Sequence, residues 1–293
     1  MNWRNKFLIC ILLVSLITVK GFSQNTPPFS LYNFNPVSFN PSFAGTSNFL
    51  IANFQGRSQW LGIPGHPTIQ NFNISSPIPI INGGICLSGN NFNEGAFQQS
   101  SITFGGAFHF KRKKSITSIG INGGLIQFVL SGDKLRSPEG NYNVGAINHN
   151  DAMLPINTIS DFSPDLNLGI SFLSEHFYLS SCALHLVPVN FQDNVFEQLN
   201  LKQEKEYIFN LGSTIGISKS FLLQPNILVK KDVSSFQSEL VINSQISNYA
   251  FLGFGYRGFN SNSSDAIICQ AGFKAKSGIC LMYSYDLPIS GIS

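Results

Sequence analysis

The sequence predicts an all-β fold: an antiparallel up-and-down β-barrel of the type that spans bacterial outer membranes. Charged residues make up 11% of the 293-residue chain, whereas typical soluble domains carry about 25%. Phe (27 residues) and Gly (26 residues) are abundant, and strand-like segments follow one another with connections that alternate between short and long. Composition alone leaves one alternative open, a secreted β-sandwich.

Residues 1–23 have the features of a cleaved export signal. A basic start and an apolar run over residues 7–19 lead to the small residues Gly21 and Ser23, which indicate cleavage before Gln24. The segment contains three basic residues and no acidic one, so the remaining chain has 15 basic and 15 acidic residues. The net charge of +3 therefore gives no indication of nucleic-acid binding.

Residues 24–47 are predicted to form a periplasmic entry segment before the barrel. Two Asn-Pro steps begin at Asn35 and Asn40, and each Pro fixes φ and moves the preceding Asn out of the helical region. A turn at Ala44-Gly45 then leads into a strand that ends in Arg57-Ser58-Gln59-Trp60. We expect Arg57 and Trp60 to anchor one rim of the barrel.

Period-two alternation of apolar and polar residues predicts thirteen strands between the entry segment and the C-terminus. Most run for about 11–15 residues, the length of a tilted membrane strand with a short rim at each end. We expect strands at residues 48–60, 67–77, 80–92, 96–110, 115–131, 164–174, 176–189, 204–218, 220–231, 236–247, 248–259, 264–275 and 277–287.

The connections divide into a short set and a long set, as in outer-membrane barrels with tight periplasmic turns and longer external loops. The short set covers residues 77–79, 111–114, 174–176, 219–220, 247–248 and 276–277. The long set covers residues 61–66, 90–95, 131–163, 190–203, 232–235 and 260–263. With a periplasmic N-terminus, every short turn is periplasmic and every long loop is external.

One face of each strand is expected to contact lipid. Phe104, Phe108, Leu168 and Phe209 lie on the apolar faces of their strands. An Arg at Leu168 should cost about 2–4 kcal/mol if this position lies at the bilayer midplane. Because Asn167 lies on the opposite face, an Arg there is expected to cost far less stability.

The strand count is odd, whereas single-chain bacterial barrels have an even number of strands. The expected domain is a barrel over residues 48–293, with thirteen strands visible and fourteen when complete. We expect the closing C-terminal strand to be absent from this chain.

The sequence contains no pattern that predicts enzymatic chemistry, a cofactor or a metal. It has no His-Glu-x-x-His, Gly-x-Ser-x-Gly or phosphate-loop motif. His66 and His149, both in long loops, are the candidates for a hydrolase site. Gly-Gly pairs at residues 83–84, 105–106 and 123–124 lie within strands and indicate close packing or bends.

Two surface features are candidate interaction sites. Lys111, Arg112, Lys113 and Lys114 form a basic turn, which either is simply solvated or docks a periplasmic partner or anionic head groups. The loop at 131–163 is too long for a simple connector. It could plug the barrel or bind a surface partner.

Several of these residues also resemble a known family. Asn35, Asn40, Pro41, Ala44, Gly45, Arg57, Gln59 and Trp60, together with Tyr283–Asp286, resemble the PorP/SprF family of the Bacteroidetes type IX secretion and gliding systems. In members of this family, one more strand follows the segment comparable to Tyr283–Asp286.

The resemblance implies a non-enzymatic outer-membrane barrel that binds proteins. Its partners would be periplasmic ring proteins of the secretion machine or an exported adhesin held at the cell surface. Lipid would surround the barrel, and no nucleic acid is expected as a partner. Two other functions stay open: a passive channel or small-molecule uptake barrel, and an outer-membrane hydrolase.

Overall fold

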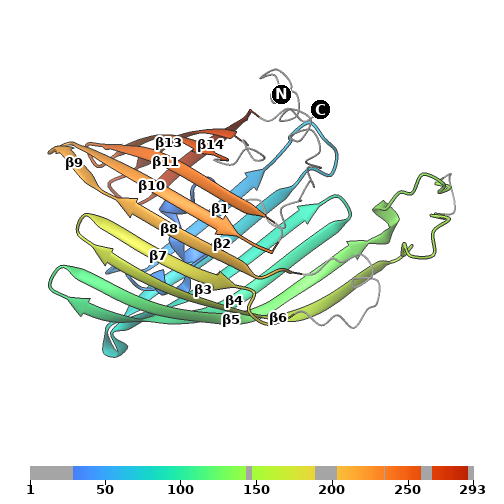
Figure 1. Ribbon diagram of the computed structural model, residues 1–293, viewed down its shortest axis with the longest axis horizontal. Coiled ribbons are helices and arrows are strands. Elements are labelled where there is room, and N and C mark those ends of the chain that lie inside the picture. The colour runs from blue at the N-terminus through green and yellow to red at the C-terminus, as the bar shows by residue number, and fades with distance from the viewer. Residues whose placement is uncertain (1–28, 143–146, 189–202, 234, 259–265, 290–293) are drawn as a thin grey trace, which may run out of the picture.

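The structure, a computed structural model, describes residues 29–142, 147–188, 203–233, 235–258 and 266–289. Fourteen strands form a single, strongly curved antiparallel sheet (Figure 1). Each strand pairs with its neighbours in sequence, except that β8 and β9 do not pair with each other and both pair with β10. The strands are Ile51–Ser58 (β1), Thr68–Ile78 (β2), Gly83–Glu94 (β3), Phe97–Arg112 (β4), Ser115–Ser131 (β5), Thr158–Ser174 (β6), Phe177–Leu184 (β7), Glu206–Ser213 (β8), Ile215–Ser218 (β9), Phe221–Lys231 (β10), Phe236–Ile246 (β11), Ala250–Arg257 (β12), Ala266–Lys274 (β13) and Cys280–Pro288 (β14).

The thirteen predicted strands are all present in the order expected. The count rises to fourteen because the predicted strand at 204–218 is divided at Thr214 into β8 and β9, which both pair with β10. The Thr214 backbone N–H donates instead to the His176 carbonyl in the neighbouring turn. The division is therefore a local interruption, and β8 and β9 together occupy one of thirteen positions along the sheet.

Strand β6 begins six residues earlier than predicted, at Thr158 instead of 164. The predicted strand began at Pro164, a residue type usually found at the beginning or edge of a strand. In the structure Pro164 lies within β6, opposite Leu125, and the strand pairs with β5 as far as Ser131. The predicted loop at 131–163 is therefore shorter, at 132–157.

Two other boundaries also differ. The predicted loop at 90–95 is wrong, because β3 extends to Glu94 and pairs with β4 up to Phe97. Strand β7 was predicted to end at 189 but ends at Leu184. The residue after Leu184, His185, has a left-handed φ of 57°. Most of the loop predicted at 190–203 falls outside the described residues.

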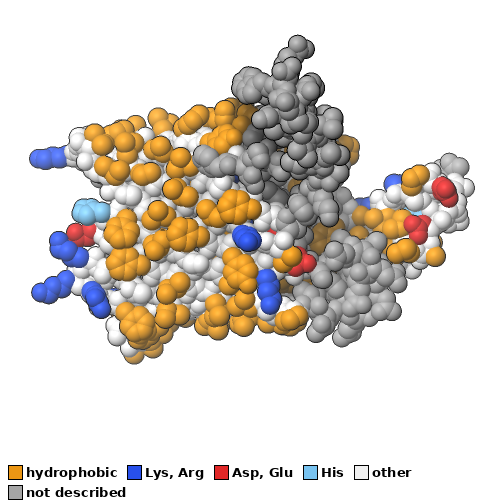
Figure 2. All heavy atoms as spheres, in the orientation of Figure 1, with side chains coloured by type: hydrophobic (Ala, Val, Ile, Leu, Met, Phe, Trp, Pro, Cys, Tyr) orange, Lys and Arg blue, Asp and Glu red, His pale blue; other side chains and the backbone are white. Residues whose placement is uncertain are grey.

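The two faces of the sheet have opposite chemistry. The concave face is lined by buried polar side chains, among them Asn73, Asn210 and Asn243, each 0% exposed. The convex face carries exposed hydrophobic side chains, which Figure 2 shows in orange. Phe104, Phe108, Leu168 and Phe209 are 61%, 47%, 42% and 42% exposed on it. Polar inside and apolar outside is the reverse of a soluble sandwich and is typical of a membrane barrel.

The surroundings of Asn167 argue against a mild effect of an Arg at this position. Asn167 is only 5% exposed on the concave face. Its amide nitrogen donates to Asp165 at 2.9 Å, and its oxygen accepts from the His185 backbone N–H at 2.8 Å. A buried side chain with two hydrogen bonds leaves no room for a longer cation.

The six connections predicted to be short all lie at one end of the sheet. We call the end with the turns after β2, β4, β6, β9, β11 and β13 the short-turn rim, and the opposite end the long-loop rim. The loop 132–157, between β5 and β6, extends away from the sheet at the long-loop rim (Figure 1). The hypothesis that this loop plugs the barrel is wrong, since the described part of it points outward.

The two edge strands, β1 and β14, run in the same direction, because the meander has thirteen positions. Within the residues that the structure describes, no backbone strand pairing joins β1 to β14. A side-chain ion pair connects them, between Arg57 of β1 and Asp286 of β14 at 2.8 Å. Among the residues that the structure describes, no helix has the length and apolar character needed to cross a membrane.

Candidate functional site

Residues 29–47, which we call the inner segment, lie along the concave face of the sheet. Three short 3-10 helices form most of it: Tyr32–Phe34 (η1), Pro36–Ser38 (η2) and Pro41–Phe43 (η3). At the long-loop rim, Ser30 contacts β14 through Asp286 at 2.8 Å. Toward the short-turn rim, the Gly45 N–H donates to Ser75 of β2 at 2.8 Å. The segment thus traverses the concave face from one rim toward the other before β1 begins.

The two Asn-Pro steps build and hold this segment. Pro36 and Pro41 each start a 3-10 helix, where the missing N–H costs nothing. Asn40 caps η3, since its side-chain oxygen accepts from the Ser42 N–H at 3.0 Å. The Asn40 amide nitrogen also donates to the Ser181 carbonyl of β7 at 3.3 Å. The Asn40 side chain therefore both caps the start of η3 and attaches it to the sheet.

Asn35 makes the equivalent connection to the other side of the sheet. It is 1% exposed, and its amide donates to Gln55 of β1 at 3.1 Å and Asn71 of β2 at 3.2 Å. Amide side chains suit this position because they can donate and accept in a site that excludes water. The two Asn residues fasten the inner segment to strands on both sides of it.

Strand glycines let the inner segment approach the sheet closely. A Cβ on Gly84 of β3 would lie 2.3 Å from the Gly45 Cα, and one on Gly120 of β5 would lie 2.4 Å from the Pro41 carbonyl carbon. Gly45 itself has a φ of +69°, a conformation that favours glycine. The prediction of close packing at the 83–84 pair is confirmed, and its cause here is contact with the inner segment.

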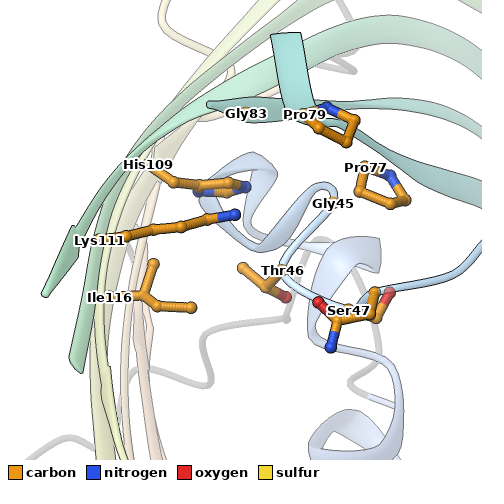
Figure 3. Close-up of a pocket in the computed structure, with 10 residues that line it drawn as sticks. Gly45, Thr46, Ser47, Pro77, Pro79, Gly83, His109, Lys111 and Ile116 are labelled. Atoms are coloured by element: carbon orange, nitrogen blue, oxygen red, sulfur yellow. The ribbon is translucent and has the colours of Figure 1, made fainter. Parts of the chain in front are cut away.

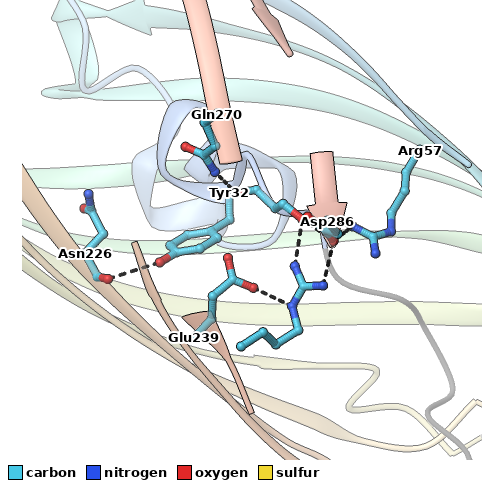
Figure 4. A network of polar contacts seen from close by, with 8 residues as sticks. Tyr32, Arg57, Asn226, Glu239, Gln270 and Asp286 are labelled. Atoms are coloured by element: carbon cyan, nitrogen blue, oxygen red, sulfur yellow. Dashed lines mark hydrogen bonds and ion pairs between the residues drawn. The ribbon is translucent and has the colours of Figure 1, made fainter. Parts of the chain in front are cut away.

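A cluster of buried charges lies where the inner segment meets β1 and β14 (Figure 4). Arg257 of β12 is at its centre and bonds to Glu239 of β11 and to Asp286 of β14, each at 2.7 Å. Asp286 also pairs with Arg57 of β1 at 2.8 Å. These four residues, which we call the ion-pair cluster, carry two positive and two negative charges. The balance matters because an unpaired charge at this depth is costly.

The inner segment completes this cluster. The Ser30 hydroxyl donates to Asp286 and accepts from Arg57 at 2.9 Å and from Arg257 at 2.7 Å. The Ser30 carbonyl accepts from Gln270 of β13 at 2.6 Å. Nearby, the Tyr32 hydroxyl donates to the Asn226 carbonyl of β10 at 3.3 Å. Burial raises the pKa of Tyr32 well above its usual value, and Glu239 adds to the shift, so the phenol keeps the proton that it donates.

A comparison with known protein families assigns the chain as a whole. Residues 21–293 match the family described as type IX secretion system membrane protein PorP/SprF. The chain belongs to the PorP/SprF family. No curated protein matches the sequence closely enough to add a nearer relative.

The structure brings together the residues that carried the resemblance to PorP/SprF proteins. Asn35, Asn40, Pro41, Ala44 and Gly45 are all buried in the inner segment. Arg57 and Asp286, which belong to two separate fragments of that resemblance, form an ion pair across the edge strands. Arg57 lies at the end of β1 beside the long-loop rim, but its side chain is only 15% exposed and pairs with Asp286 on the concave face instead of reaching the surface.

Gln59 and Trp60 follow β1 at the long-loop rim of this PorP/SprF protein. The Gln59 N–H donates to the Pro67 carbonyl at 3.0 Å and closes the connection to β2. Trp60 is 45% exposed and has a left-handed φ of 57°. These two residues lie outside the ion-pair cluster and shape the turn beside it.

The two histidines considered for a hydrolase site have structural contacts instead. His149 is 2% exposed inside the loop 132–157 and contacts the Tyr142 hydroxyl and the Pro155 carbonyl, each at 3.1 Å. His66 lies 3.2 Å from the Ile63 carbonyl in an exposed turn. Within the described ranges, no group of three or more His, Cys, Asp or Glu side chains is arranged to hold a metal ion.

The basic turn of this PorP/SprF protein is at the short-turn rim, as predicted from the connection lengths. Lys111, Arg112, Lys113 and Lys114 are all exposed there. Lys114 approaches Glu175 at 3.6 Å, a distance at which an exposed pair contributes little stability. The turn therefore leaves its charge available to a partner.

Sequence reasoning missed Ser30, Glu239 and Arg257 as members of the buried cluster. Arg257 and Glu239 are directly opposite each other in the β11–β12 register. Opposite charges at facing positions of neighbouring strands attract each other. Pairing β11 with β12 from the sequence would therefore have indicated this ion pair. Ser30 carries no such signal, because its role depends on where the inner segment lies.

Proposed function

We propose that this chain is a non-enzymatic outer-membrane component of the type IX secretion system that acts by binding proteins. Membership of the PorP/SprF family supports the system, and the apolar convex face supports a barrel inserted in lipid. The observation that carries the binding function is the inner segment, which occupies the concave face of the sheet. A barrel whose interior is occupied in this way presents its rims to partners instead of a pore.

We place the short-turn rim in the periplasm and the long-loop rim outside the cell. In this arrangement residues 1–23 are the export signal and the barrel covers residues 48–293. The basic turn Lys111–Lys114 then faces the periplasmic ring proteins, and the loop 132–157 faces an exported adhesin. The basic turn and most of the described residues of the loop are exposed, which suits contact with large partners.

Deletion of the gene tests this proposal. We expect loss of surface display of one type IX cargo protein, or of all of them if the chain belongs to the core machine. Purification of the tagged protein should recover that cargo or the periplasmic ring proteins. Lys111→Glu combined with Lys113→Glu should weaken recovery of ring proteins without unfolding the barrel. Normal display of every cargo together with altered uptake of small solutes would support the channel function instead.

Conductance in planar bilayers tests the occupied interior directly. The wild-type protein should show no sustained open-pore current. Gly120→Ala should displace the inner segment, because the new Cβ would meet the Pro41 carbonyl carbon at 2.4 Å, and should cost about 1–3 kcal/mol. This variant should show current fluctuations that the wild type lacks.

Gly89→Ala is the matched control, since its Cβ would have no contact closer than the Ser101 oxygen at 3.8 Å. It should behave as the wild type does. Steady conductance from the wild-type protein, unchanged by Gly120→Ala, would refute a blocked interior.

A further inference from the structure

The charges of this protein are distributed unequally between its two rims. Of the twelve acidic residues that the structure describes, eleven lie in the half toward the long-loop rim, and Glu175 alone lies at the short-turn rim. The short-turn rim carries seven exposed basic residues, which we call the basic crown. Its members are Lys111, Arg112, Lys113, Lys114, Lys219, Lys274 and Lys276.

The basic crown is largely unpaired. Lys114 approaches Glu175 at 3.6 Å, and in the described part of the chain no other member has an acidic side chain within ion-pair distance. Figure 2 shows Lys and Arg side chains in blue that project beyond this end of the sheet. Like charges held together on one rim create a positive potential that favours an acidic partner.

A small cavity opens within this rim (Figure 3). Its volume is about 100 Å³, and it lies where the inner segment leaves the concave face to enter β1. The lining includes Gly45 and Ser47 of the entering chain, Pro77 of β2, and His109 and Lys111 of β4. Figure 3 shows the side chains of His109 and Lys111 reaching from β4 toward the turn at Gly45.

His109 has an unused polar atom at this cavity. The side chain is 2% exposed, and its Nδ1 lies 2.7 Å from the Ser118 hydroxyl. Its Nε2 is buried and forms no well-aligned hydrogen bond, although the Ala44 and Gly45 backbone lies close enough to interact with the ring. If the Ser118 hydroxyl donates to Nδ1, the proton of the neutral ring is on Nε2, a donor without a well-aligned acceptor. A buried donor of this kind costs free energy until an acceptor reaches it.

We infer that the short-turn rim binds an acidic segment of a protein partner and that one carboxylate of this segment enters the cavity between Lys111 and His109. The inference rests on the proposed protein-binding function and adds the chemistry of the partner. The Lys111 ammonium supplies the charge and the His109 Nε2–H a directed hydrogen bond. The remaining members of the basic crown attract the rest of the acidic segment.

The position of the cavity favours a protein carboxylate over a lipid head group. Lys111 lies on the same strand face as His109, which is the concave face. The residue between them, Phe110, is 53% exposed on the convex face. Lipid surrounds the convex face, so its head groups lie around the outside of the rim. A protein segment beneath the barrel can reach the cavity from the axis.

Fluorescence anisotropy with a labelled decapeptide of glutamate tests the inference on the full chain in neutral detergent. Lys111→Gln should weaken binding on the order of tenfold, since it removes a charged hydrogen bond inside the cavity. Lys113→Gln is the matched variant on the same turn but outside the cavity, and should weaken binding about twofold. Lys134→Gln, at the long-loop rim, should leave binding unchanged.

If Lys111→Gln and Lys113→Gln weakened peptide binding equally, the cavity would have no special part in binding, and the inference would be overturned. It would also be overturned if nanodiscs containing phosphatidylglycerol abolished peptide binding while nanodiscs of phosphatidylcholine preserved it, because lipid phosphates would then occupy the rim. Either result leaves recovery of secretion partners from cells unaffected. If peptide binding follows the expected order but no secretion partner is recovered, the proposed function fails and the binding site stands.

Discussion

Replacing Arg257 with Met is expected to destabilise the protein by about 3–5 kcal/mol. The Arg257 side chain is 3% exposed and bonds to Glu239, Asp286 and Ser30 at 2.7 Å each. Its removal leaves Glu239 buried without its cation, and burial of an unpaired charge is far more costly than the pair itself is stabilising. Urea unfolding of the protein in lipid vesicles, followed by tryptophan fluorescence, measures the loss.

Two further variants isolate the cause. Lys231→Met removes an exposed cation from β10 and should change stability by no more than about 0.5 kcal/mol. In the double variant Arg257→Met with Glu239→Met, Asp286 keeps Arg57 as its partner, and stability should recover part of the loss. A double variant less stable than Arg257→Met would show that volume, and not charge, dominates at this site.

Replacing Leu168 with Arg is expected to cost about 2–4 kcal/mol. Leu168 is 42% exposed on the convex face near the middle of β6. If that face contacts hydrocarbon, the guanidinium must leave water or distort the bilayer around it. The same unfolding measurement in vesicles gives the cost.

Phe162→Arg is the matched comparison, because this residue lies on the same face of the same strand and is 57% exposed. It is six positions closer to the long-loop rim, or roughly 20 Å along a strand. The cost of an arginine falls to about 0–1 kcal/mol near the interface. Similar small costs at both positions would mean that water covers the convex face and that the membrane assignment is wrong.

The sequence by itself determined the strands, their order and which residues of each strand share a face. Period-two alternation is a local property, so residues such as Phe104 and Phe209 could be assigned to one face without knowledge of the fold. Turn residues set where strands reverse, which placed the six predicted short turns at one end, although the β3–β4 turn at the other end is also short. The errors lie where a local rule was overridden, as at Pro164, which continues β6 because the long strand β5 offers it a full partner.

Only the tertiary structure decided what the polar face encloses. The sequence indicated a turn-rich segment at residues 24–47, but a pattern of Asn, Pro and Gly does not say which surface it will contact. Its place on the concave face follows from distant partners: Gly84 and Gly120 make space for it, and Ser30 joins Asp286, 256 positions away. The ion-pair cluster has the same origin, since curvature of the sheet brings the first and last strands together. Alternation shows which residues share a face, whereas only the curvature of the sheet shows which of them meet.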